Sequence, residues 1–388
     1  MASQDHLDKI GDIAAQAGLR HIHVLAWRDL ADVEAGGSEI HAATVARLWA
    51  EAGLDVTMRT SYAQGAPPES TRNGYRVIRR AGRYLVFPRG IISEMTGRHG
   101  PRDGLVEIWN GVPWLTPLWA TGPKMTWLHH VHGPMWRMVL PPRLARAGEL
   151  LEQAIAPPLY RRARVVTLSE SSRRELIERL GFRASRVSVV PPGIDARYRT
   201  GGVKAEHPLV VAVGRLMPVK RFDLLIAALA GIRASHPGLE LVIVGEGSER
   251  ERLEVVIAAH DAAEWARLPG RLSDEALVAL YQRAWLVASA SAAEGWGMTI
   301  TEAAACGTTA VVTDIGGHRD AVIHGVSGLV CDPIELGAAV ASLLADPVLR
   351  RRMSERAQSR AGELTWEATA AATLSVLADE ATRRRGTR

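Results

Sequence analysis

Residues 208–231 read PLVVAVGRLMPVKRFDLLIAALAG, and this stretch decides the fold. Its first half is a short run of branched apolar residues, which is typical of a strand buried on both faces. From Arg221 to Ala234 the apolar residues recur with helical spacing, and Gly214 marks the junction between the two halves. A strand, a glycine-containing loop and a helix in succession form the unit from which parallel α/β sheets are built.

The same alternation continues on both sides of this stretch. Further helices are predicted at Ser38–Ala52, Ser248–His260 and Asp274–Gln282 and from about Thr299. Further strands are predicted at Ile22–Ala26, Val56–Arg59, Tyr75–Ile78, Leu105–Trp109, Lys124–Leu128, Val165–Leu168, Leu239–Gly245, Trp285–Ser289 and Thr309–Thr313.

A Pro/Gly-rich segment, Val187–Gly202, interrupts the pattern near the middle of the chain. We therefore predict two Rossmann-like domains, at residues 1–197 and 198–365. Residues 366–388 are predicted to form a helix that packs back toward the N-terminal domain, followed by a basic tail. Ligands of such sheets bind in the crevice at the carboxyl ends of the strands.

Composition excludes several classes of protein. The 388 residues contain no apolar run of about 18 residues, so no membrane span is expected. Acidic residues within the first 20 positions argue against a signal peptide. Cys306 and Cys331 are too few for a disulfide framework or a four-cysteine zinc site. A soluble, cytoplasmic α/β protein is the expectation.

The charge is unevenly distributed along the chain. Residues 1–200 hold 27 basic and 19 acidic side chains, whereas residues 201–388 hold 20 and 23. A basic first half suits phosphate groups or an anionic membrane surface. Its arginines are scattered rather than clustered, which argues against nucleic acid. Only four of the 47 basic residues are lysines, so Lys220 draws attention.

Two loops combine glycine with charge. Gly36-Gly37-Ser38-Glu39 lies between a predicted strand and helix, where exposed N–H groups attract anions. A plain turn capped by Ser38 is the alternative. Arg215 and Lys220 follow the strand at 209–213 and offer two cations to a diphosphate. The alternative there is a solvated surface pair.

The segment 293–303, AEGWGMTITEA, is the most specific local signal. Glu294 and Glu302 stand on either side of a glycine loop that opens a helix. The free N–H groups around Gly297–Thr299 suit a phosphate, whereas the two carboxylates are expected to accept hydrogen bonds from hydroxyl groups. The alternative is an ordinary capped helix with surface glutamates.

Residues 127–133, WLHHVHG, end a predicted strand with three histidines. No second cluster of ligands completes a metal site, so packing or a hydrogen-bonding and proton-transfer role remains open for His132. Five of the 11 tryptophans fall nearby, and they can stack on sugar rings or pack in the core. These five are Trp109, Trp114, Trp119, Trp127 and Trp136.

In order and spacing, these motifs resemble the retaining glycosyltransferases of family 4, which have the GT-B fold. The resemblance covers nearly the whole chain and includes VGRLMPVKRFDLLIAAL, LVIVGEGSE, LPGRLSDEALVALY and the E-x7-E spacing of Glu294 and Glu302. It implies an α/β protein whose two Rossmann-like domains face a central cleft. The family usually has Phe at Trp296, which bears on the size of the donor pocket.

The resemblance also implies roles for individual residues. Arg215 and Lys220 would bind the diphosphate of a UDP- or GDP-sugar, Glu302 its ribose and Glu294 the hydroxyls of the sugar. The amides of Gly297, Met298 and Thr299 would face the phosphates, and Gly270-Arg271-Leu272 would hold the base. Gly37 would approach the diphosphate from the N-terminal domain, and His132 would lie near the sugar and the acceptor. No metal or other cofactor is expected.

The implied reaction moves a hexose to an acceptor hydroxyl with retention, forming an α-glycosidic bond. Cations and the helix N-terminus would stabilise the leaving diphosphate, and same-face displacement through an oxocarbenium-like state is favoured. The expected acceptor is an envelope glycolipid or polysaccharide precursor, with peripheral membrane contact through the basic domain. Alternatives are a small secondary metabolite (an aminocyclitol or an aglycone) as acceptor, or a catalytically inactive sugar-nucleotide-binding relative.

Overall fold

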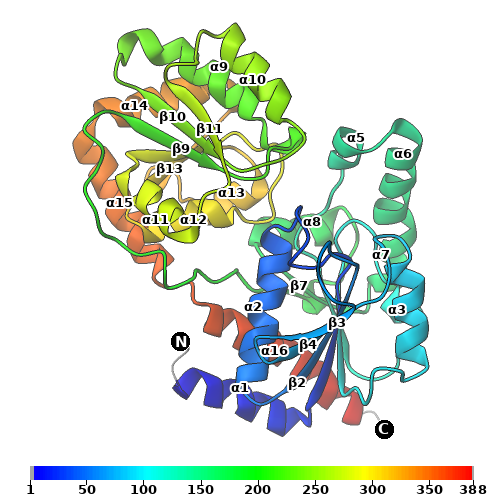
Figure 1. The fold of residues 1–388 in the computed structure, drawn as a ribbon. Helices are drawn as coiled ribbons and strands as arrows, with labels where there is room; N and C mark the ends of the chain where they lie inside the picture. Colours follow the sequence, from blue (N-terminus) through cyan, green and yellow to red (C-terminus); the bar gives the residue numbers. More distant parts are fainter. Residues whose placement is uncertain (1–3, 387–388) are drawn as a thin grey trace. The chain divides into compact units, whose positions relative to one another are not determined.

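The computed structural model describes residues 4–386, and the chain divides into two compact α/β units (Figure 1). Unit 1 comprises Met1–Gly193 together with Trp366–Arg388, and unit 2 comprises Ile194–Thr365. Unit 2 begins four residues before the predicted boundary, because Ile194 packs against Ala304 and Ala361 and donates a 2.9 Å backbone hydrogen bond to Leu364.

Unit 1 is built on an eight-stranded sheet in the order β3-β4-β2-β1-β5-β6-β7-β8. All neighbours are parallel except β3, which is antiparallel to β4. Its strands are β1 (His21–Leu25), β2 (Asp55–Thr60), β3 (Glu69–Arg72), β4 (Tyr75–Arg79), β5 (Gly104–Ile108), β6 (Lys124–Trp127), β7 (Arg164–Thr167) and β8 (Val187–Val189).

Helices connect these strands in sequence. They are α1 (Gln4–Ala17), α2 (Gly37–Glu51), α3 (Val86–Met95), α4 (Thr116–Trp119), α5 (Met135–Val139), α6 (Pro142–Leu150), α7 (Ala156–Tyr160), α8 (Glu170–Glu178) and α16 (Trp366–Arg385). A π-helical turn, Leu151–Ile155, joins α6 to α7.

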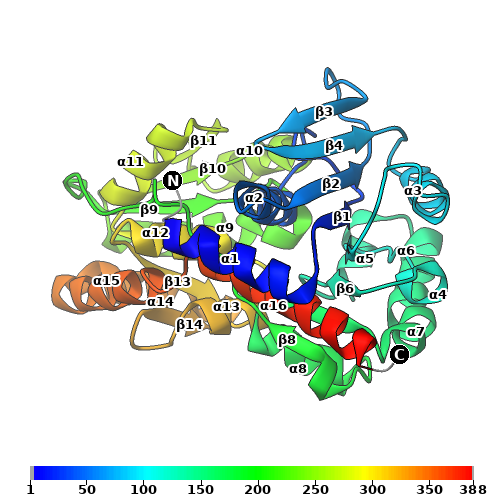
Figure 2. The same ribbon diagram turned by 90° about the horizontal axis from the view of Figure 1, so that it is seen from below.

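The last helix, α16, packs within unit 1 beside α1, as the red and blue helices in Figure 2 show. The indole N–H of Trp49 on α2 donates a 3.0 Å hydrogen bond to the carbonyl of Ala370. The hydroxyl of Thr369 donates to the carbonyl of Pro191 at 2.8 Å. The helix continues to Arg385, where Glu380 pairs with Arg383 and Arg384, so these arginines are part of the helix rather than a separate tail.

Unit 2 contains a six-stranded, all-parallel sheet in the order β11-β10-β9-β12-β13-β14. Its strands are β9 (Leu209–Val213), β10 (Glu240–Val244), β11 (Ala266–Gly270), β12 (Leu286–Ser289), β13 (Thr309–Thr313) and β14 (Gly328–Cys331). Its helices are α9 (Phe222–Ile232), α10 (Arg250–Ala259), α11 (Asp274–Arg283), α12 (Met298–Ala305), α13 (Gly316–Ala321), α14 (Leu336–Ala345) and α15 (Pro347–Ala361).

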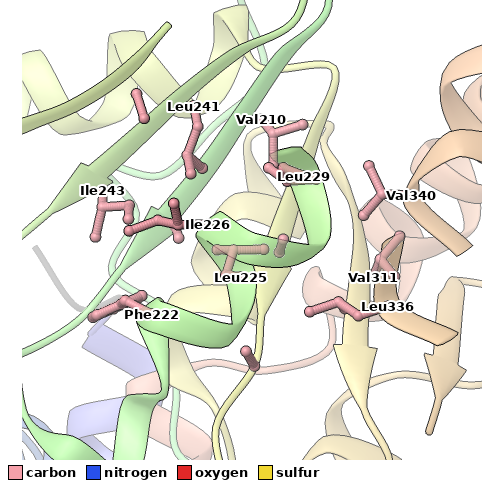
Figure 3. Packing of buried hydrophobic residues seen from close by; sticks show 14 of the residues in the cluster. Val210, Phe222, Leu225, Ile226, Leu229, Leu241, Ile243, Val311, Leu336 and Val340 are labelled. Carbon is pink, nitrogen blue, oxygen red and sulfur yellow. The ribbon is translucent and has the colours of Figure 1, made fainter. Parts of the chain in front are cut away.

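The opening sequence stretch forms β9 and α9, and both are buried in the core of unit 2. Leu225, Ile226 and Leu229 on α9 are fully buried against Val210 and Leu241 of the sheet (Figure 3). Burying a side chain of this kind contributes roughly 1.5–3 kcal/mol. Because helices cover both faces of a parallel sheet, its central strands are apolar on both sides, as the sequence LVVAV indicates.

In each unit the strand order reverses at one point, between β1 and β5 in unit 1 and between β9 and β12 in unit 2. The loops that leave the two central strands there diverge to opposite faces of the sheet and leave a crevice at its carboxyl edge. The reversal in unit 2 therefore lies between the loop that contains Lys220 and the loop that contains Glu294.

Within residues 4–386, no helix combines the length and the apolar character that a bilayer-spanning segment requires.

Close backbone packing fixes the loop after β9. Gly245 has a φ of +145°, and a Cβ atom placed there would lie 1.9 Å from the carbonyl oxygen of Gly214. Two hydrogen bonds, from Gly214 to Val244 at 3.0 Å and from Leu216 to Glu246 at 2.9 Å, bind the same segments together. Only glycine at position 245 allows this approach.

We expect Gly245→Ala to lower the free energy of unfolding by more than about 3 kcal/mol, because backbone atoms cannot move aside as a flexible side chain can. Urea denaturation measures the loss. Gly231→Ala is the matched control, because position 231 lies within α9 and has no atom within 4 Å of its added Cβ. That control should be neutral or stabilising, and an equal loss in both variants would contradict the packing argument.

Candidate functional site

Two loops meet at the carboxyl edge of the unit 2 sheet. The first follows β9 and ends in a 3₁₀ turn, Pro218–Lys220, and the second follows β12 and leads into α12. The amide of Ala292 donates a 2.8 Å hydrogen bond to the carbonyl of Val219, which joins the loops directly. The two residues singled out from the sequence, Lys220 and Glu294, are thereby brought together.

Lys220 and Glu294 form an ion pair through Nζ and Oε1. The side chains are 21% and 18% exposed, so the pair is partly shielded yet open to a ligand. Ser291 donates a second hydrogen bond to the same carboxylate oxygen at 2.9 Å. Burial alone raises the pKa of Glu294, but the charge of Lys220 and the hydrogen bonds from Lys220 and Ser291 lower that pKa to about 2. Glu294 is therefore a carboxylate at neutral pH.

A buried histidine and two serines lie next to the carboxylate of Glu294. The ring of His318 is fully buried, with Nδ1 2.8 Å from the carbonyl of Thr313 and Nε2 3.1 Å from the hydroxyl of Ser289. Since a carbonyl only accepts, Nδ1 carries the proton and Nε2 accepts from Ser289. The hydroxyl of Ser289 lies 3.2 Å from that of Ser291. Each hydroxyl has one proton, which Ser289 gives to His318 and Ser291 gives to Glu294, so the two serines are in contact without a hydrogen bond between them. Burial lowers the pKa of His318, which favours the neutral ring.

The glycine loop after Glu294 packs against the start of α13. A Cβ atom on Gly317 would come within 2.5 Å of the carbonyl oxygen of Glu294. Gly297 has a φ of +108° and caps α12, whose first residues are Met298 and Thr299. The first N–H groups of a helix have no partner inside it and attract anions. Trp296 is buried, and its indole N–H has no hydrogen-bond partner among the described residues.

Glu302 lies one turn further along α12 and contacts tyrosines instead of cations. The hydroxyl of Tyr281 is 3.4 Å from its Oε2. Burial raises the pKa of Glu302 to about 7, although hydrogen bonds from Tyr281 and Tyr198 lower it in part. The carboxyl group is thus able to hold or release a proton near neutral pH.

The segment Gly270-Arg271-Leu272 follows β11 at the same edge of the sheet. The carbonyl of Gly270 accepts a 2.9 Å hydrogen bond from Gly245, and the pair Glu246–Arg250 lies against it. Arg271 and Arg215 are both exposed. They lie on the loops after β9 and β11, on either side of β10, and this spacing suits a nucleotide that extends along the edge.

In unit 1 the predicted glycine motif also lies at the point where the strand order reverses. The amide of Gly36 donates to the Glu39 carboxylate at 2.8 Å, and Gly37 is the exposed first residue of α2. Asn110, in the loop after β5, donates a 3.3 Å hydrogen bond to the Ser38 hydroxyl.

The three histidines after β6 have different surroundings. His129 is buried and lies 3.2 Å from His41, ring nitrogen to ring nitrogen. The ring of His132 stacks on His130 at 4.6 Å, and its side chain is 15% exposed. In residues 4–386 no three His, Cys, Asp or Glu side chains are grouped so as to hold a metal ion.

Most of the nearby tryptophans are core residues, so their suggested role in stacking on sugars is wrong for four of the five. Trp109, Trp114, Trp127 and Trp136 are all buried, each at 8% exposure or less. Large aromatic rings bury more apolar area than any other side chain, so a clustered set of them favours the core over the surface. Trp119 is partly buried and donates to the carbonyl of Trp114 at 2.8 Å.

Sequence reasoning missed the supporting residues Ser291 and His318. The signal for His318 was present as Gly316-Gly317-His318 directly after a predicted strand, where paired glycines indicate close backbone approach.

At the amino edge of the same sheet, a separate cavity of about 490 Å³ includes Lys204, Trp285 and Arg350. Lys204 donates there to the carbonyls of Ala284 and Gly307. The cavity lies at the opposite edge of the sheet from Lys220 and Glu294.

Two family models match the chain. Glycosyl transferases group 1 matches residues 197–360, and Glycosyltransferase Family 4 matches residues 35–198. The chain is 30% identical over 402 residues to the D-inositol 3-phosphate glycosyltransferase of Kineococcus radiotolerans, covering 88% of this chain and 90% of that protein. It is 28% identical over 401 residues to the D-inositol 3-phosphate glycosyltransferase of Segniliparus rotundus, covering 90% and 86%.

Solved structures show the same fold. Sucrose-phosphate synthase from Thermosynechococcus elongatus matches with a TM-score of 0.80 at 22% identity, over 91% of this chain and 97% of that one. Anabaena HepE, solved with UDP and glucose, matches with a TM-score of 0.69 at 20% identity, over 91% and 97%. The two parallel α/β sheets therefore have the GT-B fold, as predicted.

Replacement of Lys220 by Met tests the ion pair. A carboxylate with a lowered pKa contributes stability above its ordinary pKa of 4.5, and that contribution is lost as the pH falls toward 2. Lys220→Met should therefore lower the free energy of unfolding at pH 7 by about 2 kcal/mol and by less at pH 4. Urea denaturation at both pH values measures this difference.

The double variant Lys220→Met/Glu294→Gln is the control, because it removes the unpaired carboxylate. It should recover most of the stability at pH 7. An equal loss of unfolding free energy at pH 7 and pH 4, with no recovery in the double variant, would contradict a stabilising ion pair between Lys220 and Glu294.

Proposed function

Because the chain belongs to glycosyltransferase family 4 and is a nucleotide-sugar glycosyltransferase, we propose that it transfers a hexose with retention from a nucleoside-diphosphate sugar to an acceptor hydroxyl, forming an α-glycosidic bond. One observation carries the proposal: Lys220 and Glu294 form an ion pair on the two loops that flank the strand reversal of unit 2. A cation for a diphosphate and a carboxylate for hydroxyl groups thus lie side by side at the edge where α/β sheets bind ligands.

In this proposal unit 2 binds the donor. Lys220 and Arg215 bind the diphosphate together with the amides of Gly297, Met298 and Thr299. Glu294 accepts hydrogen bonds from the sugar hydroxyls, and Glu302 does the same for the ribose. The base lies against Gly270-Arg271-Leu272. No metal cation is required, since the lysine, the arginine and the start of α12 supply positive potential.

The pKa of Glu294 and the charge of Lys220 support different roles for these two side chains in the reaction. A carboxyl group with a pKa near 2 is a poor general acid, so Glu294 serves as a hydrogen-bond acceptor rather than a proton donor. As the bond from the anomeric carbon to the phosphate oxygen breaks, negative charge grows on the diphosphate beside Lys220. The leaving phosphate then takes the proton of the acceptor hydroxyl, and that oxygen attacks the same face of the sugar.

We also propose substrate-binding roles for two residues of unit 1. Gly37, exposed at the first turn of α2, leaves room for the diphosphate to approach the helix N-terminus. His132 contacts the sugar or the acceptor through its ring.

For the acceptor we propose an envelope glycolipid or polysaccharide precursor at a membrane surface. The support is the exposed side of α6, which combines Leu144 and Leu150, at 58% and 56% exposure, with Arg143 and Arg146. Apolar and cationic side chains together suit an anionic bilayer interface.

A small cyclitol is the second candidate acceptor, favoured by the names of the relatives in Kineococcus and Segniliparus, each of which this chain covers over most of its length. The five tryptophans at 109–136 give no support to a small flat acceptor, because four of them are buried.

The donor assignment is tested by thermal shift against UDP, GDP, ADP and their glucose or mannose conjugates. We expect one nucleotide, UDP first, to raise the melting temperature of the wild type and to lose this effect in Lys220→Ala. Lys9→Ala, a change of an exposed lysine on α1, is the matched control and should keep the shift. No shift with any nucleotide at millimolar concentration would contradict the proposal. Nucleotide binding without turnover would indicate the inactive relative.

The membrane contact is tested by sedimentation with phosphatidylglycerol vesicles. We expect partition at low ionic strength that is lost at about 0.5 M salt, since screening weakens surface attraction. Arg143→Glu/Arg146→Glu should reduce partition at least about fivefold, whereas the control Arg352→Glu/Arg356→Glu, exposed on α15, should not. Equal partition of all three proteins would contradict the contact, and transfer to free inositol phosphate would then favour the cyclitol.

A further inference from the structure

The loop that contains His132 is bound to one buried carboxylate, that of Glu152. This side chain accepts hydrogen bonds from the amides of His132 at 2.8 Å and Gly133 at 2.9 Å. It also accepts from the indole N–H of Trp136 at 3.1 Å, and Nδ1 of His132 lies 3.4 Å from Oε1. Glu152 is 1% exposed, so three hydrogen-bond donors surround a carboxylate that water does not reach, and Nδ1 of His132 lies close to it without a hydrogen bond.

The backbone explains why Glu152 points inward. It belongs to the π-helical turn Leu151–Ile155, where the amide of Ala156 bonds back to the carbonyl of Leu151. Pro157 and Pro158 have no N–H groups and crowd the preceding turn, so a wider turn accommodates them. The flanking Leu150 and Ile155 are exposed, at 56% and 51%, whereas Glu152 is directed into the unit. Such π turns recur at functional sites.

The charge of Glu152 depends on the loop that it holds. Burial raises the pKa of Glu152, but the hydrogen bonds from the amides of His132 and Gly133 and the nearby ring of His132 outweigh burial and lower that pKa. Among residues 4–386, Glu152 pairs with His132 and with no lysine or arginine. A buried carboxylate without a fixed cation is costly unless its hydrogen bonds are complete, so the loop and the carboxylate constrain each other.

Trp136 limits the other side of the ring. Its indole lies 5.0 Å from the ring of His132, centroid to centroid. Cβ atoms on Gly148 and Gly111 would come within 2.7 and 2.8 Å of the indole, so these glycines hold it from two sides. The ring of His132 is therefore confined between His130 and Trp136, with Nδ1 toward Glu152.

We propose that Glu152 is a positioning residue: it holds the His132 loop, places its negative charge beside Nδ1 of His132 and thereby leaves Nε2 as an unprotonated hydrogen-bond acceptor toward a substrate hydroxyl. A carboxylate accepts and cannot donate, so it selects the Nδ1–H tautomer. Nε2 is on the far side of the ring from Nδ1 and is the nitrogen left for the sugar or the acceptor. This inference rests on the proposed function, in which His132 contacts the substrates.

A double-mutant cycle on UDP release from UDP-glucose tests the inference. Glu152→Gln keeps the shape but removes the charge and cannot accept from all three N–H donors, and it should lower kcat about tenfold while KM for UDP-glucose changes less than about threefold. In a His132→Ala background the same change should have almost no effect on kcat. Glu149→Gln, three residues earlier and paired with exposed Arg137, is the matched control and should leave kcat unchanged. Losses that multiply in the double variant would overturn the positioning role.

The tautomer of His132 can be read in the wild-type protein without turnover, and the Glu152 variant is not needed. Long-range ¹H–¹⁵N correlation spectra of the wild type, assigned with His132→Gln, should show the proton of His132 on Nδ1 at pH 8. A proton on Nε2 would overturn the inference. If the tautomer is as expected but neither UDP-glucose nor any other sugar nucleotide is bound or turned over, the proposed function fails and the positioning of His132 by Glu152 stands.

Discussion

The ion pair between Lys220 and Glu294 depends on how the sheet of unit 2 is ordered. Because β12 lies beside β9 although some 70 residues separate them in the sequence, the loops that follow these strands meet at the carboxyl edge. Tight glycine contacts fix one loop, through Gly245 against Gly214, and the other, through Gly317 against Glu294. Ser291 donates to the carboxylate of Glu294, and the neighbouring Ser289 donates to His318. A charged pair is thus held at the surface by a rigid, apolar sheet.

The two glutamates of the E-x7-E spacing are not equivalent. A lysine and a serine hold Glu294 as a carboxylate, whereas burial beside tyrosines brings the pKa of Glu302 near neutrality. Their environments therefore separate their chemistry: Glu294 is a permanent acceptor, and Glu302 is able to exchange a proton with its surroundings. In unit 1 a third carboxylate, Glu152, holds a histidine loop instead of a ligand.

The sequence was sufficient for the central strands and for the strand-end loops that contain Lys220 and Glu294, because these signals are local. LVVAV is a buried strand, and a glycine followed by charge marks a strand-end loop. Edge strands such as β11, with the sequence ARLPG, carry no apolar run and were not predicted. The tryptophans were ambiguous because their burial depends on distant partners, such as Trp109 on Tyr160 and Phe182. The same holds for His318 and Glu152, which reach their partners across the fold.

The proposed function requires that a nucleoside diphosphate binds at the carboxyl edge of the unit 2 sheet. Hydrogen–deuterium exchange of the wild type with and without saturating UDP tests this claim most directly. We predict slower exchange in peptides covering residues 214–220, 270–272 and 294–302, with little change elsewhere in unit 2. Protection confined to peptides at 200–205 and 350–358, which line the cavity at the amino edge, would contradict this claim.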